Sequence, residues 1–201
     1  MWFFRNILNT HMHRLALYED CIELSMPVDV IDLTTLNWVP YNPRKKIERY
    51  GCSITSLDGN DTGIPDLDSV LEYNNENQTG YEEKDFNVPT HHSAPFRHFL
   101  KRFQVGRCHY LKLPPGGFFP WHRDVDTDSF RIIYTIEHCN PVDFVWLEDD
   151  KLIELQDQRW YYINTRKKHC VFSFQTAVFA VFNVLMNDHN YAEFQKSIYI
   201  K

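Results

Sequence analysis

The chain contains 201 residues and carries a formal net charge of −6 at pH 7. Hydrophobic residues make up 43% of the sequence and aromatic residues 15%. A disordered chain would be poor in both, so we expect one folded domain spanning residues 1–201. The negative charge argues against a broad surface for nucleic acid or for an anionic membrane.

Cysteine usage indicates a reducing compartment, and the hydropathy pattern contains no candidate membrane span. The 5 cysteines are scattered and never in CxxC spacing, which argues against a disulfide framework or a zinc ribbon. No apolar stretch approaches the roughly 18 residues of a membrane span, and Arg5 comes too early for a signal-peptide core. We therefore expect a cytoplasmic protein that makes no membrane contact.

The N-terminal half has mixed patterns. The alternation of apolar and polar residues predicts strands at 28–33 and 50–57. Segment 66–73 follows a proline and is predicted to form a short helix. The polar stretch 74–92 contains glycine and proline and is predicted to be a long loop. For residues 1–26, the pattern fits a strand and a short helix equally.

Two polar features in this half have simple explanations. The basic run 44–46 is typical of a solvated face. His91 and His92 are adjacent, and adjacent side chains of an extended chain point apart, so we expect them to contact solvent or substrate rather than a metal.

The C-terminal half is predicted to be mainly β-structure. Apolar residues recur at helical spacing over 96–103, which predicts a helix packed on a sheet. Short strand-like segments separated by polar turns then follow at 107–113, 130–138, 142–148, 151–155, 159–164, 169–174 and 177–186. This succession predicts an antiparallel sandwich or barrel.

Three residues in this half have the chemistry of a metal centre. His122 and Asp124 are two positions apart, so in an extended segment both side chains point to one face and can converge on one ion. His169, at the start of a late strand, is the best candidate for a third ligand. Two histidines and one carboxylate leave coordination positions open, as in non-haem Fe(II) oxygenases. The pattern therefore predicts a catalytic metal centre rather than a structural one.

The same segment resembles the 2-oxoglutarate- and Fe(II)-dependent oxygenases. The turn 113–116, the His122-x-Asp124 motif, Arg131 and the distal His169 are similar to the aspartyl/asparaginyl β-hydroxylase branch. The resemblance implies a jelly-roll core, the double-stranded β-helix of cupins, at about 105–187, with N-terminal α/β additions. It also implies Fe(II) and 2-oxoglutarate as cofactors and the hydroxylation of an unactivated carbon.

The resemblance implies a role for one arginine, and the sequence departs from the family at a second basic position. Arg131 corresponds to a family arginine that binds the far carboxylate of 2-oxoglutarate, which its planar guanidinium fits. Many relatives place a second Arg or Lys where this chain has Phe179. Asn183 is a candidate polar helper.

The substrate remains open at this level. The family implies a peptidyl aspartyl, asparaginyl or prolyl side chain, and a small amino-acid-like metabolite is an alternative; nucleic acid is disfavoured by the acidic charge. Two other functions fit the same residues. One is a non-catalytic jelly-roll binding or assembly protein, and the other is a cupin-like metal enzyme that uses no keto acid.

Overall fold

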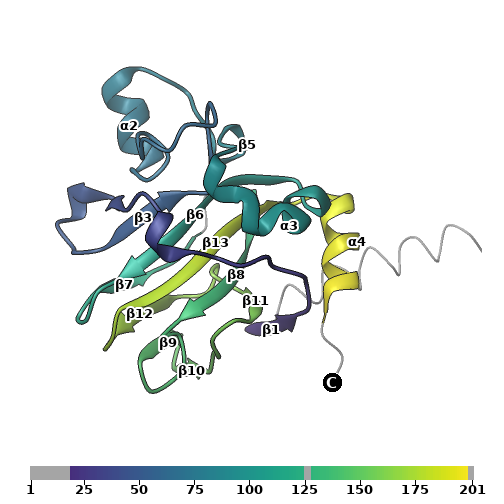
Figure 1. Cartoon of the computed structure of the whole chain (residues 1–201). Helices are drawn as coiled ribbons and strands as arrows, with labels where there is room; N and C mark the ends of the chain where they lie inside the picture. The colour runs from purple at the N-terminus through teal and green to yellow at the C-terminus, as the bar shows by residue number, and fades with distance from the viewer. Residues whose placement is uncertain (1–18, 125–127, 199–201) are drawn as a thin grey trace, which may run out of the picture.

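The computed structural model describes residues 19–124 and 128–198, which form two main antiparallel sheets (Figure 1). The larger sheet contains, in spatial order, β1 (Cys21–Leu24), β11 (Trp160–Ile163), β8 (Ser129–Glu137), β13 (Ala177–Leu185), β6 (Val105–Leu113), β3 (Tyr50–Ser53) and β2 (Val39–Pro40). The smaller sheet contains β10 (Lys151–Ile153), β9 (Phe144–Glu148), β12 (His169–Ser173) and β7 (Phe118–His122). A two-stranded sheet pairs β4 (Thr55–Ser56) with β5 (Val88–Pro89).

Strands β6 to β13 wind into a double-stranded β-helix. Along the chain, β6, β8, β11 and β13 lie in the larger sheet, and β7, β9, β10 and β12 lie in the smaller one. The strand order β6-β13-β8-β11 faces the order β7-β12-β9-β10, so the chain passes between two layers as in a jelly roll. The predicted fold class, mainly β with a jelly-roll core, is confirmed.

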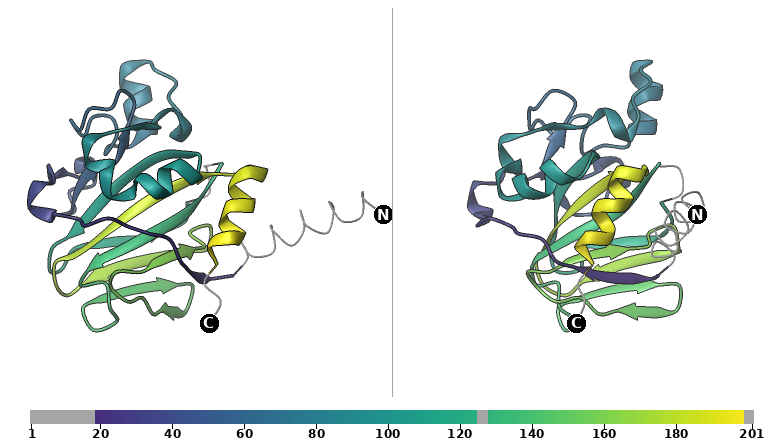
Figure 2. Two further views of the ribbon diagram at one scale, coloured as in Figure 1. Left: turned by 45° about the vertical axis from the view of Figure 1, so that its right-hand side comes forward. Right: turned by 90° about the vertical axis from the view of Figure 1, so that its right-hand side faces the viewer.

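Helical segments occupy the N-terminal half and the C-terminal end. They are η1 (Leu33–Thr35), η2 (Pro43–Lys45), α2 (Val70–Asn77), η3 (Glu83–Asp85), η4 (His91–Phe96), α3 (Arg97–Arg102) and α4 (Asp188–Ser197). Helices α3 and α4 lie on the side of the larger sheet that faces away from the smaller one (Figure 2). The expected N-terminal α/β additions are therefore present.

Strand β13 is buried on both faces because it lies between two hydrophobic layers. Its outward-facing Phe182 packs on Phe99 of α3 at a ring distance of 4.4 Å, and Phe99 stacks on Trp160 at 4.9 Å. Its Phe179 faces the other way and meets Trp146 of the smaller sheet. Replacing such a fully buried phenylalanine by alanine costs about 3–5 kcal/mol.

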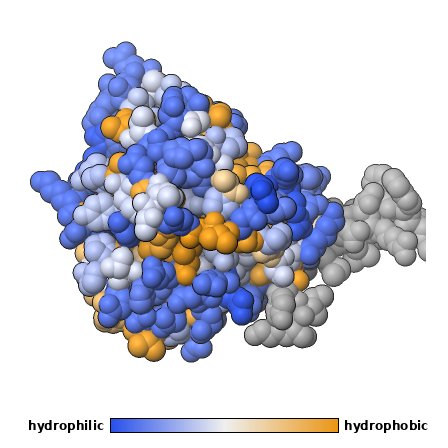
Figure 3. Space-filling view, viewed as in Figure 1, coloured by the Kyte–Doolittle hydropathy of each residue, from blue (hydrophilic) through white to orange (hydrophobic). Residues whose placement is uncertain are grey.

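An apolar band crosses the face seen in Figure 3, over the region where segment 25–36 runs in Figure 1. The predicted strand at 28–33 lies in this segment and is not a strand: residues 28–32 join no sheet, and Leu33 begins η1. Instead Val28 and Ile31 pack on the core of the larger sheet. The alternation therefore reflects a covering segment rather than strand pairing.

Other predicted elements differ in their bounds. The helix predicted at 66–73 begins later, at Val70, where Ser69 caps its N-terminus. The predicted loop 74–92 contains the end of α2, all of η3 and β5, and the first turn of η4. Of the undecided stretch 1–26, residues 1–18 lie outside the described part, and Cys21–Leu24 is a strand. No helix within 19–124 and 128–198 is long and apolar enough to cross a membrane.

Candidate functional site

The three residues of the predicted metal motif come together at one end of the smaller sheet. His122 is the last residue of β7, and it pairs in register with His169, the first residue of β12. The strand that follows the Pro-Gly turn thus begins at Phe118 and ends at His122. Asp124 follows β7, and its backbone N–H donates to the carbonyl of Thr165 at 2.9 Å.

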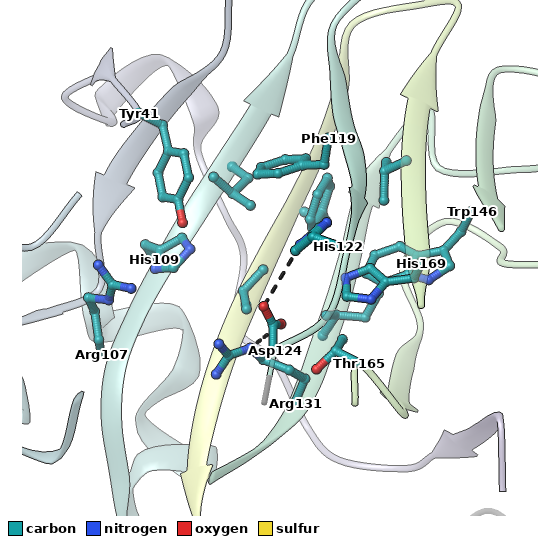
Figure 4. A pocket seen from close by; sticks show the side chains of 15 residues that line it. Tyr41, Arg107, His109, Phe119, His122, Asp124, Arg131, Trp146, Thr165 and His169 are labelled. Atoms are coloured by element: carbon teal, nitrogen blue, oxygen red, sulfur yellow. Dashed lines mark hydrogen bonds and ion pairs between the residues drawn. The ribbon is translucent and has the colours of Figure 1, made fainter. Parts of the chain in front are cut away.

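The side chains of His122, Asp124 and His169 converge (Figure 4). One ligand atom from each lies within 4.8 Å of the other two. Nε2 of His122 is 3.8 Å from Oδ1 of Asp124, and the two imidazole centroids are 4.1 Å apart. The His-x-Asp spacing predicted the convergence of His122 and Asp124, and His169 was the candidate named for the third position.

Both imidazoles are oriented through their Nδ1 atoms. Nδ1 of His122 lies 2.7 Å from the carbonyl oxygen of Pro120, and Nδ1 of His169 lies 3.0 Å from that of Lys167. A carbonyl only accepts, so each Nδ1 carries a proton, and in the neutral form of either ring the lone pair is on Nε2. Hydrogen bonding of this kind orients metal-binding histidines in general.

The protonation of the cluster also suits a cation. Burial lowers the pKa of His169, which keeps its ring neutral at pH 7. Burial, the largest single effect, would by itself raise the pKa of Asp124, but the positive charge of Arg131 and smaller contributions from His122, His169 and Thr165 together outweigh it, so the net shift is downward. The site therefore presents a neutral imidazole beside an ionised carboxylate.

Arg131 belongs to a row of polar side chains across the larger sheet. Its Nε donates to Oδ2 of Asp124 at 3.3 Å, and its Nη1 donates to Oδ1 of Asn183, its register partner on β13. Nδ2 of Asn183 donates to Glu83 at 2.8 Å. Glu83 in turn binds Arg107 of β6 through two N–H groups, at 2.7 and 3.0 Å. The structure thus brings together Arg131 and Asn183, which the sequence analysis singled out.

A pocket of about 140 Å³ opens between the metal motif and a second polar wall. That wall consists of Arg107, His109 and Tyr41 (Figure 4). His109 is buried, burial lowers its pKa well below the usual value, and its Nδ1 has no hydrogen-bond partner among the described residues. Sequence reasoning missed this wall, although residues 107, 109 and 111 alternate onto one face of β6.

The aromatic residues of the pocket shape its metal side. Trp146 stacks on His169 with ring centroids 5.6 Å apart and an interplanar angle of 9°. Its indole Nε1 has no hydrogen-bond partner among the described residues. Phe179 is 2% exposed, lines the pocket and packs against Phe144.

Arg49 lies next to the pocket, and its positive charge is not balanced by an ion pair with any described carboxylate. It is 5% exposed, and its guanidinium lies over the rings of Phe119, at 4.3 Å, and Tyr41, at 5.3 Å. Its Nε donates one long hydrogen bond, of 3.4 Å, to the backbone carbonyl of Tyr41. Among the described residues, no carboxylate forms an ion pair with it. Both rings line the pocket, so a cation lies just behind the pocket wall.

Comparisons with known proteins give structural neighbours only. No family model matches the chain, and no curated protein matches it. A 2OG-Fe(II) oxygenase family oxidoreductase from Burkholderia pseudomallei is similar at 12% identity, over 76% of this chain and 74% of that one, with a TM-score of 0.44. A prolyl-4-hydroxylase from Pseudomonas putida is similar at 14% identity, over 74% and 78%, with a TM-score of 0.40.

Cupins are also among the neighbours. A predicted oxalate decarboxylase from Thermotoga maritima is similar at 12% identity, over 78% of this chain and 100% of that one, with a TM-score of 0.40. At these identities and TM-scores the likeness does not identify a function. The fold assignment rests on the strand order of the two sheets.

Proposed function

We propose that this chain is an Fe(II)- and 2-oxoglutarate-dependent dioxygenase that acts as a hydroxylase. In this proposal His122, Asp124 and His169 bind the metal, and Arg131, assisted by Asn183, binds the far carboxylate of the keto acid. The observation that carries it is the orientation of the two histidines: each Nδ1 is engaged by a backbone carbonyl, so each Nε2 is left for a shared ion beside Asp124.

The donor set fits Fe(II). Two neutral imidazoles and one carboxylate are ligands that a borderline divalent ion accepts, and three protein ligands leave coordination positions for other molecules. Bound iron, together with the keto acid, would supply the activation of O2 that hydroxylation of an unactivated carbon requires. The residues of the chain orient the reactants and exclude water.

The charge of the pocket favours an anionic cosubstrate. Its lining contains two guanidinium groups, of Arg107 and Arg131, and one carboxylate, of Asp124. A divalent ion would add further positive charge, so a dianionic keto acid complements the pocket. Tyr41 and His109 offer further polar contacts.

Arg131 is a better candidate than Arg107 for the far carboxylate. Arg107 already has its own partly buried counter-ion in Glu83 and also donates to the carbonyls of residues 66 and 68. Arg131 forms an ion pair with Asp124, a residue that a metal ion would also bind. A bound metal ion would therefore compete with Arg131 for Asp124 and leave the guanidinium available to another carboxylate.

The substrate in this proposal is an aspartyl, asparaginyl or prolyl side chain of a peptide or protein, or a small amino-acid-like metabolite. The resemblance to the aspartyl/asparaginyl β-hydroxylase branch supports the first group. The cation of Arg49 behind the pocket wall favours substrates that carry a carboxylate. All five cysteines are free thiols, which fits the cytoplasmic location that we propose.

The test is an anaerobic titration of the metal-free protein with Fe(II) and then with 2-oxoglutarate. We expect the weak visible charge-transfer band of an iron-chelated keto acid to appear in the wild type and to be lost in His122→Ala. His138→Asn is the matched control, because His138 is a histidine paired with a carboxylate, Asp143, outside the pocket. Absence of iron binding by the wild type would favour the non-catalytic binding protein.

A second candidate function is a cupin-like metal enzyme that uses no keto acid. The buried Phe179 favours it, because this apolar ring occupies the place of the second basic residue. The same titration separates the two candidates: the alternative predicts that iron binds and that adding 2-oxoglutarate changes neither the spectrum nor the melting temperature.

A further inference from the structure

A second cluster of metal-ligating side chains lies apart from the pocket. Asp61, in the connection after β4, meets His91 and His92 at the start of η4, and one ligand atom from each lies within 4.8 Å of the other two. The Tyr110 hydroxyl, which belongs to the core under α3, donates to the carbonyl of His92 at 3.0 Å. This cluster is therefore on the outer side of the larger sheet, whereas the pocket is on its inner side.

The two histidines do not point apart as expected from an extended chain. His91 and His92 belong to a 3₁₀ helix, and their ring centroids are 3.7 Å apart. Nε2 of His92, a buried residue, is 2.9 Å from Oδ2 of Asp61. His91 is exposed, so one side of the cluster is open to water.

The backbone that carries these ligands is held by hydrogen bonds, which are buried at Thr90 and exposed at Asn37. The hydroxyl of Thr90 accepts from the backbone N–H of His92 at 3.2 Å and donates to the carbonyl of Ser53 at 2.7 Å. On the other side, the Asn37 side chain donates to the carbonyl of Asp61 at 3.2 Å. A metal ion would therefore meet ligands that are already in position, with little conformational entropy left to lose.

We propose that Asp61, His91 and His92 bind a divalent transition ion such as Zn²⁺. Two imidazoles and a carboxylate suit zinc, and water completes the coordination on the exposed side. An ion pair accounts for Asp61 and His92 but gives His91 no role; a metal uses all three. Because the ligands come from two segments of the chain, the ion ties the connection after β4 to η4 and stabilises the folded state.

The proposal is tested with Co²⁺, whose visible bands report nitrogen and oxygen ligands, on the full chain. The variant His122→Ala with Asp124→Ala removes the pocket ligands, so any remaining tight site is a different one. We expect this variant to bind one Co²⁺ per chain in equilibrium dialysis and to melt at a higher temperature when Zn²⁺ is added. Adding His91→Ala should weaken Co²⁺ binding by about tenfold or more.

His138→Asn, added to the same background, is the control. Nδ1 of His138 is 3.0 Å from Oδ2 of Asp143, so these residues form a histidine–carboxylate pair like that of His92 and Asp61 but with no second histidine in the pair. Loss of His138 should therefore leave Co²⁺ binding unchanged. The proposal is overturned if the pocket variant binds no Co²⁺, or if His91→Ala leaves its affinity unchanged. Neither result bears on the oxygenase proposal, because two of its three proposed metal ligands, His122 and Asp124, are absent from these variants.

Discussion

Arg131 is hydrogen-bonded to Asp124: Nε of the arginine lies 3.3 Å from Oδ2 of the carboxylate. The residue proposed for the keto acid is thus the partner of a residue proposed for the metal. A metal ion at Asp124 would weaken the contact of Asp124 with Arg131 and so leave Arg131 available to the keto acid. We therefore expect that iron must be bound before 2-oxoglutarate binds tightly.

The first prediction concerns Arg131. Arg131→Gln removes a charge-assisted bidentate contact worth about 1.5–3 kcal/mol, so 2-oxoglutarate affinity should fall by about 10- to 100-fold while iron still binds. Arg131→Lys keeps the charge but loses the planar fork, so an intermediate affinity is expected. Isothermal titration of the anaerobic iron-loaded protein measures both. The exposed Arg159, changed to glutamine, is the control, and equal loss of affinity in that variant would refute the role of Arg131.

The second prediction concerns Trp146. Its ring stacks on His169, so an iron ion bound to that histidine would quench its fluorescence at short range. We expect anaerobic Fe(II) to lower tryptophan emission saturably in the wild type, and the decrease to be lost in Trp146→Phe, which keeps an aromatic ring in the stack. Trp38→Phe, at a tryptophan that packs on Tyr110 outside the pocket, should keep the full decrease. A decrease unchanged in Trp146→Phe would mean that iron binds elsewhere.

The third prediction concerns Gly106, where η3 approaches β6. A Cβ at this position would lie 2.4 Å from the backbone oxygen of Glu83, and backbone cannot move aside cheaply. Gly106→Ala should therefore displace η3, disturb the Glu83 bonds to Arg107 and Asn183, and lower the free energy of unfolding by about 1–3 kcal/mol. Denaturant unfolding measures the change.

The control for Gly106 is Gly80, whose added Cβ would meet nothing within 4 Å. Gly80→Ala should leave stability unchanged or raise it by about 0.4–1 kcal/mol, because it restricts the unfolded chain. If both variants behaved alike, the close packing of η3 on β6 would not be what holds Glu83 in place.

Local sequence patterns predicted much of the jelly roll. Strands β8 and β13 were predicted to within one residue of their ends, because apolar residues fill buried strands and polar turns separate them. Strand β7 was missed because Pro120 interrupts it. It tolerates the proline as an edge strand of the smaller sheet, and edge position is a property of the sheet order rather than of the segment.

The convergence of His122 and Asp124 was predictable, but the rest of the pocket was not. His122 and Asp124 are two residues apart, so their convergence follows from local geometry. The link from Arg131 through Asn183 to Glu83 depends on the register between strands and on where η3 packs. The contact of His91 with His92 likewise depends on a 3₁₀ turn, where an extended chain would separate them.

The fourth prediction concerns the pH dependence of stability and rests on Asp66. This side chain is 2% exposed, and burial raises its pKa from 3.8 to about 6, although the N–H of Leu57 donates to it at 3.3 Å. Between these two values the folded state binds more protons than the unfolded state, so this group lowers stability as pH rises from about 4 to 6. Because a shift of one pKa unit corresponds to about 1.4 kcal/mol, the loss in the free energy of unfolding is about 2–3 kcal/mol.

Asp66→Asn should remove this dependence, because the amide keeps an acceptor for Leu57 and cannot ionise. Relative to the wild type, the variant should gain about 2–3 kcal/mol of stability between pH 4 and pH 7.5, measured by urea unfolding at each pH. Asp32→Asn should show the opposite sign, and only below the ordinary aspartate pKa of 3.8, because hydrogen bonds from Thr34 lower the pKa of Asp32 and its contribution is lost as pH falls through that lower value. A wild-type and Asp66→Asn pair with parallel pH profiles would show that Asp66 is ionised throughout, with its burial compensated by the nearby Arg107.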